Sequence, residues 1–171
     1  MTVQTAYNQN IEQGYPGLPY DLTDHNALGL SAEASSIRFG AAVVFGTGDD
    51  QARLPDSANA LGAGASGLLF AGIVMREQVR EQKPTALVSP LGDDKNYAEA
   101  TETLSVKTAG RIYAICETVS NPGDPVHFRH AGVGFLGALR NAADGVNTQL
   151  IPNAKWLKTV SAGGLSVVDL G

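Results

Sequence analysis

Apolar residues gather along this chain in short runs separated by turn-forming residues, and almost no run keeps the period of an amphipathic helix. Residues 36–46 are rich in β-branched and aromatic side chains and end at a glycine before the polar residues 47–50, so they predict one strand. Residues 68–75 form a continuous apolar run that follows the small, flexible residues 55–67. This pattern predicts a surface loop that leads into a buried strand.

Strand patterns continue in the second half of the chain. Leu104 and Val106 alternate with polar neighbours, and residues 111–119 also have the composition of a strand. A strong turn signal, Asn-Pro-Gly-Asp-Pro, follows at 121–125, and an extended run resumes at 126–130. We therefore expect the strands on either side of this turn to form a hairpin.

The remaining C-terminal pattern predicts short strands joined by loops. Residues 141–153 are polar and loop-like, whereas residues 154–160 and 165–170 have strand composition. The best helix candidate is the stretch 76–83, which Pro84 limits to two turns and which could equally be an exposed loop. The fold class is therefore mainly β, with a sandwich, a barrel or a jelly roll as the possible architectures.

The first 25 residues differ from the rest of the chain. They are polar and rich in glycine and proline, they carry Tyr7, Tyr15 and Tyr20, and they show neither helical nor strand periodicity. Tyrosine offers a large contact area with a polar tip, so these residues suit an arm that lies along a partner. We predict an extended N-terminal arm, residues 1–25, before a single β domain, residues 26–171; packing of the arm on its own domain is the alternative.

Composition narrows the classes of function. Charged residues make up 17% of the 171-residue chain, below the ~25% typical of soluble domains, which leaves more neutral surface for protein contacts. The net charge of −5, with only 12 scattered Lys and Arg residues, argues against nucleic-acid binding. No apolar run approaches the ~20 residues of a membrane span, and no secretory signal is visible, so we expect no membrane contact and synthesis in the cytoplasm.

Residues with catalytic or ligand-binding potential are few. The spacing G-x-G-x-x-G occurs at 62–67, but it lacks the preceding strand and following helix that a dinucleotide site needs. His127 and His130 would lie on opposite faces of a strand, and His25 stands in the predicted arm. The lone Cys116 excludes an intrachain disulfide and has the setting of a core residue.

The acidic pairs also favour an ordinary structural interpretation. Asp49-Asp50 and Asp93-Asp94 stand in turns outside any calcium-loop pattern, and no serine lies in a G-x-S-x-G elbow. We therefore predict no catalytic residues, no cofactor and no metal site, and hence no enzyme.

The order of these β-and-turn patterns resembles the structural cement or capsid decoration proteins of tailed bacteriophages. No single pattern is specific, and the resemblance lies in their order and spacing over nearly the whole chain. The matching segments are residues 14–17, 36–43, 110–114, 121–126 and 161–170.

This resemblance implies a jelly-roll-like fold and a protein that clamps neighbouring copies of the major capsid protein from the outer surface of the virion. It also implies synthesis in the bacterial host cytoplasm and self-association, with a homodimer favoured and a homotrimer possible. Under this hypothesis the arm contacts the capsid or a sister subunit through Tyr7, Ile11, Tyr15, Leu18 and Tyr20.

Two other classes of function remain open. A small β-domain hydrolase would need a pocket in which His127 or His130 bonds to a carboxylate beside a nucleophile. A carbohydrate- or receptor-binding β-sandwich would expose Trp and Tyr on a shallow face, and the single Trp156 lies in a predicted strand instead.

Overall fold

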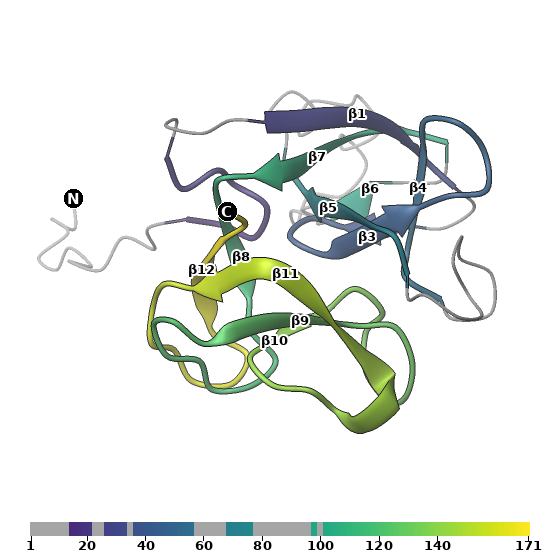
Figure 1. Cartoon of the computed structure of the whole chain (residues 1–171). Helices are drawn as coiled ribbons and strands as arrows, with labels where there is room; N and C mark the ends of the chain where they lie inside the picture. Colours follow the sequence, from purple (N-terminus) through teal and green to yellow (C-terminus); the bar gives the residue numbers. More distant parts are fainter. Residues whose placement is uncertain (1–13, 22–25, 34–35, 57–67, 77–96, 99–100) are drawn as a thin grey trace, which may run out of the picture.

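A computed structural model describes residues 14–21, 26–33, 36–56, 68–76, 97–98 and 101–171. The described residues form two packed β layers, a closed barrel and a five-stranded sheet (Figure 1). The elements are β1 (Asn26–Ala32), β2 (Ile37–Arg38), β3 (Ala42–Phe45), β4 (Gln51–Arg53), β5 (Phe70–Val74), β6 (Tyr97–Ala98), β7 (Thr103–Ala109), β8 (Arg111–Ile115), β9 (Pro125–Arg129), β10 (Leu139–Arg140), the 3-10 turn η3 (Gly145–Asn147), β11 (Thr148–Trp156) and β12 (Leu165–Asp169). The mainly β prediction is confirmed, and the arrangement is compatible with a jelly-roll-like body.

The barrel is built by the first half of the described chain together with β7. Its strand order is β1-β4-β3-β5-β7, and β1 closes it by pairing antiparallel with β7 and parallel with β4. The short strands β2 and β6 pair separately. Closure removes the free strand edges that would otherwise invite pairing with other chains.

The second sheet has the order β10-β9-β11-β12-β8. The predicted hairpin across the turn at 121–125 is wrong, because β8 pairs with β12 and β9 pairs with β11. The turn itself explains the difference: the Gly123 amide donates to the Trp156 carbonyl at 2.8 Å, and the Trp156 amide donates to the Asp124 carbonyl at 2.9 Å. These two bonds fix the start of β9 against β11, away from β8.

The second sheet also curls until the end of β8 meets β10. Cys116, the residue after β8, forms an isolated bridge with Leu139, and the amide of Glu117 donates to the Leu139 carbonyl at 2.8 Å. The side chain of Glu117 is thereby brought next to the loops that flank β10.

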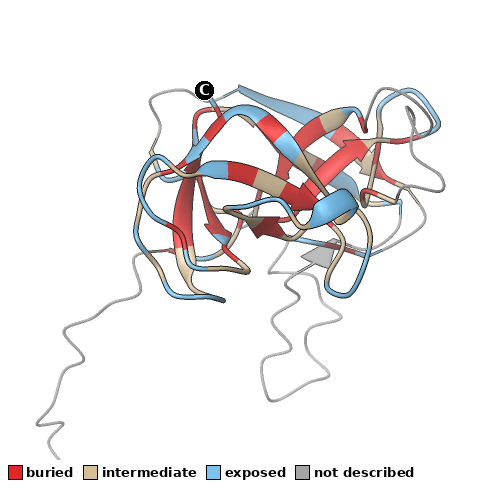
Figure 2. Cartoon of the chain, turned by 60° about the horizontal axis from the view of Figure 1, so that its bottom comes forward, coloured by how far each residue is buried: buried red, intermediate tan, exposed pale blue. Residues whose placement is uncertain are grey.

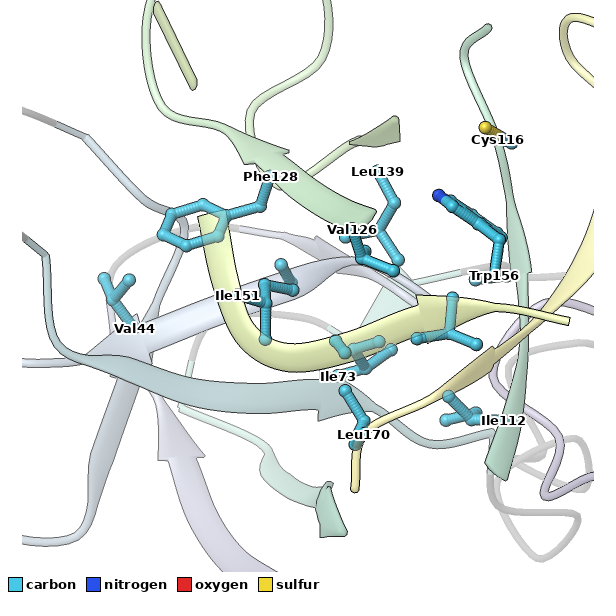
Figure 3. Close-up of a cluster of buried hydrophobic side chains, with 14 of the residues drawn as sticks. Val44, Ile73, Ile112, Cys116, Val126, Phe128, Leu139, Ile151, Trp156 and Leu170 are labelled. Atoms are coloured by element: carbon cyan, nitrogen blue, oxygen red, sulfur yellow. The ribbon is translucent and has the colours of Figure 1, made fainter. Parts of the chain in front are cut away.

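Two hydrophobic clusters form the core. One fills the barrel, and the other lies between the barrel and the second sheet (Figure 3). Strand β3 serves both, because Val43 belongs to the barrel cluster and Val44 to the cluster between the layers. Trp156 and Phe128 are fully buried in the second cluster, and Figure 2 shows buried positions concentrated in the strands of both sheets.

Four predictions about strands need correction. Residues 36–46 do not form one strand, because the chain turns at Gly40, whose positive φ of 77° breaks the run into β2 and β3. The polar stretch 141–153 is not all loop, since β11 begins at Thr148 and pairs with β9. The strand predicted at 111–119 ends at Ile115, and the strand predicted at 154–160 ends at Trp156.

Several predictions fall on residues outside those described. The loop at 57–67, most of the helix candidate at 76–83 and the pair Asp93-Asp94 are among them. The division between an arm and a single β domain at residue 25 stays a prediction.

Candidate interaction surface

The segment of residues 14–21, which we call the strap, lies along the outer edge of β8. The Gly17 amide donates to the Tyr113 carbonyl at 2.8 Å, and the Tyr113 amide donates to the Leu18 carbonyl at 2.9 Å. Pro19 bridges Ile112 in antiparallel fashion. The strap therefore adds an antiparallel segment to the second sheet and covers an edge that would otherwise be open.

The strap also contacts the barrel at Gly17. The Arg76 amide, just after β5, donates to the Gly17 carbonyl at 2.8 Å. Gly17 has a φ of 86°, and a Cβ there would lie 2.9 Å from the Arg76 nitrogen and 2.9 Å from the Val74 oxygen. Only glycine fits both the backbone conformation and the space, and through it the strap ties the two layers together.

Aromatic rings and cations surround the strap. Tyr15 is 54% exposed, and the Arg76 guanidinium lies 5.3 Å from the centre of its ring. Tyr20 is 40% exposed, packs edge-on against Tyr113 and has the Lys158 ammonium 4.8 Å from its ring centre. Burial, with a smaller effect of Tyr20, raises the pKa of Tyr113. Tyr15 and Tyr20 thus present partly exposed rings from a fixed backbone.

The predicted arm contacts divide into two groups. Tyr15, Leu18 and Tyr20 all lie in the strap, where Leu18 is half-buried and the two tyrosines are exposed. Tyr7 and Ile11 lie outside the described residues. The backbone of the strap already forms hydrogen bonds with β8 and with the barrel. A partner would therefore contact the tyrosine rings rather than pair with a free strand.

A second exposed feature was missed by the sequence reasoning. Residues 131–138 and 141–147, which we call the tip, form the loops on either side of β10. Val133 is 97% exposed and Val146 is 87% exposed. The amide of His130, at the base of the first loop, donates to the Asn147 carbonyl at 2.9 Å, and this bond holds the two loops together. The available signal was the run 131–138, which contains no charged residue.

A network of four charged side chains lies at the base of the tip. Arg129 is 6% exposed and donates from Nη2 to Glu117 Oε2 at 2.9 Å and from Nη1 to Asp144 Oδ2 at 3.0 Å. Arg140 also reaches Asp144, at 2.9 Å. The hydrogen bond from Arg129, helped by the charges of Arg140 and Arg129, lowers the pKa of Asp144. Arg129 Nη1 also donates to the Ala131 carbonyl at 3.4 Å, so the network joins both loops of the tip to Glu117, just beyond the end of β8.

Of the histidines and the cysteine considered for chemistry, the structure describes Cys116, His127 and His130, whereas His25 lies outside the described residues. Cys116 is fully buried, and its Sγ lies 3.7 Å from Thr118 Oγ1. Burial and then the charge of Arg140 lower the pKa of His127. Among the described residues, Nδ1 of His127 and of His130 has no hydrogen-bond partner, so neither ring is bonded to a carboxylate through that atom.

The described residues also bear on metal binding, on membrane spanning and on an exposed aromatic surface. In the described ranges, no three His, Cys, Asp or Glu side chains are grouped as a metal would require, and no helix has the length and apolar character to cross a membrane. Trp156 is fully buried and forms no exposed aromatic platform. Asp49 and Asp50 are exposed in a turn.

Comparison with known proteins identifies the family. A chain in a structure titled "The capsid of Myoviridae Phage XM1" matches with a TM-score of 0.69 and 13% identity, over 100% of this chain and 98% of that chain. At this identity the likeness concerns the fold. No curated protein sequence matches. The family model described as "Structural cement protein (E217 gp24/Pam3 gp6)" matches residues 3–171, and the chain therefore belongs to this family of phage structural cement proteins.

Proposed function

We propose that this protein binds the outer surface of a shell of major capsid protein and clamps neighbouring subunits, without catalysing a reaction. The observation that carries the proposal is the family match over residues 3–171. The strap supports it, because a rigid segment that presents two exposed tyrosines suits contact with another protein. The sparse charge of the chain agrees with this role.

The mechanism is thermodynamic linkage. A protein that binds the assembled shell but not free subunits stabilises the shell by mass action, and several contacts on one molecule add avidity. In this proposal Tyr15, Leu18 and Tyr20 contact the shell or a sister subunit, and so do Tyr7 and Ile11. The protein acts as a homodimer, or alternatively as a homotrimer, at the outer surface of the virion after synthesis in the host cytoplasm.

The experiment uses purified shells that lack this protein and measures its binding by co-sedimentation. Tyr15→Ser should weaken binding by about tenfold, because an exposed aromatic anchor at an interface typically carries this much. Leu28→Ser, which changes a 39% exposed residue of β1 away from the strap, is the matched control. If the wild-type protein never sediments with shells, the proposed function is wrong.

A truncation separates the two groups of arm residues. Removing residues 1–13 takes away Tyr7 and Ile11 but leaves every strap contact with β8 in place. Reduced binding with an unchanged unfolding transition would assign shell contacts to Tyr7 and Ile11. Unchanged binding would remove them from the contact surface.

A further inference from the structure

A clamp must contact two neighbours at separate places, and the strap offers only one of them. The strap pairs with Ile112 near the start of β8, whereas Glu117, just beyond the end of β8, anchors the tip. Five residues of extended chain separate these positions by about 17 Å. In Figure 1 the purple strap and the light-green segment that leads into β11 lie on opposite sides of the molecule.

The tip has the composition of a contact surface. Val133 and Val146 are the most exposed large hydrophobic residues of the described chain, at 97% and 87%. Asp144 is the only charged residue of the tip loops, and both Arg129 and Arg140 bond to it. The network places two cations against two carboxylates, so these four charges balance one another.

The tip is also fixed before any partner arrives. Its base is tied by the buried Arg129, and its first loop packs against the barrel, where the Ala42 amide donates to the Gly137 carbonyl at 2.8 Å. The Arg38 guanidinium lies 4.3 Å from the centre of the Phe135 ring. A surface that is ordered in advance loses little conformational entropy on binding.

We infer that the tip is the second shell contact, and that Val133 and Val146 enter an uncharged apolar depression on a capsid subunit next to the one that the strap contacts. This inference rests on the proposed function. Because the four charges of the network are paired with one another, an apolar protein surface accepts the two valines without leaving any of these charges unpaired.

The test compares the double variant V133S/V146S with the wild-type protein in the shell co-sedimentation assay. Both side chains are exposed, so the thermal unfolding midpoint should not change. Binding should weaken by about tenfold or more, and the ratio of variant to wild-type Kd should be the same at low and high salt, because neither substitution changes a charge. The matched control is L28S/L69S, which changes one exposed residue in β1 and one just before β5.

The possible outcomes are distinguishable. If the wild-type protein binds shells and V133S/V146S binds equally well, the tip is not a contact and the proposed function stands. If the wild-type protein does not bind, the proposed function itself fails. If V133S/V146S loses self-association in sedimentation velocity before any shell is added, the tip joins copies of this chain, and the inference is overturned.

Discussion

The strap and the tip both present exposed side chains from backbone that main-chain hydrogen bonds hold, but a different kind of additional contact reinforces each of them. The strap is held by main-chain hydrogen bonds to a sheet edge and by a glycine packed against backbone atoms, and it presents tyrosine rings. The tip has main-chain hydrogen bonds of its own and, in addition, a network of four charged side chains, and it presents aliphatic groups. One small β protein therefore reinforces two surfaces by different contacts, so sequence changes, salt and pH should affect the two surfaces differently.

The largest expected effect is a difference in stability between two glycine variants. An added Cβ would collide with backbone atoms at the strap glycine but would meet open space at the tip glycine. Gly17→Ala should destabilise the protein by about 3 kcal/mol, because a positive φ and close backbone atoms both oppose a Cβ. At the tip, Gly145 has a φ of 55° with no atom within 4 Å of an added Cβ. Gly145→Ala should therefore cost only about 1 kcal/mol, the strain of the left-handed backbone. Denaturant unfolding measures both values.

A third glycine gives a second measurement of what a left-handed backbone costs in stability where an added Cβ has open space. Gly163 combines a φ of 77° with open space, so Gly163→Ala should match Gly145→Ala. Equal costs at Gly17 and Gly163 would show that the strap is not packed against the barrel as described.

An intermediate effect is expected at the base of the tip. Arg129→Met should destabilise the protein by about 2 kcal/mol, less than for a fully buried pair because Glu117 and Asp144 are partly exposed. At the strap, Arg111 is 46% exposed and bonds to Asp21 and Asp169. Arg111→Met should cause no measurable loss at physiological salt, because exposed ion pairs are screened. Equal losses for the two variants would contradict the contrast between the regions.

The pH dependence of the free energy of unfolding tests whether the ion pair between Arg129 and Asp144 causes the loss expected at the tip. The pKa of Asp144 is lowered in the folded protein, so its contribution to stability is present above its unfolded pKa of about 3.9 and is lost as the pH falls through the lower folded value. The stability difference between wild type and Arg129→Met should therefore be constant from about pH 7 to about pH 5 and shrink below about pH 4. The lowered pKa values of Glu33 and Asp124 act in both proteins and cancel. A difference that persists to low pH would contradict the ion-pair account.

The smallest expected effect concerns the cations over aromatic rings. Lys158→Met, beside Tyr20 of the strap, should cost about 0.5 kcal/mol, the usual value of an exposed cation–π contact. Arg38→Met, over Phe135 of the tip, should cost a similar amount. A double-mutant cycle of Lys158→Met with Tyr20→Leu isolates the strap contact, and zero coupling would show that the ammonium does not stabilise the ring.

Local patterns in the sequence predicted much of the fold but not the strand partners. Alternation around Leu104 and the apolar run before Met75 identified β7 and β5, because periodicity reports which side chains are buried. The strand β11 was missed in part because its solvent-facing positions make it look like a polar loop. The partner of β8 was also missed, since a turn signal says where the chain reverses but not which strands pair.

The sequence alone determined the β class, the sparse charge, the glycine- and tyrosine-rich segment that contains the strap and, through the order of its motifs, the family. Only the tertiary structure placed Arg129 against Glu117 and Asp144, and the strap against β8. The physical reason is that strand propensity and turn chemistry act over a few neighbouring residues. Contacts between residues far apart in the chain depend on how the two hydrophobic clusters pack, and that is decided by the whole molecule.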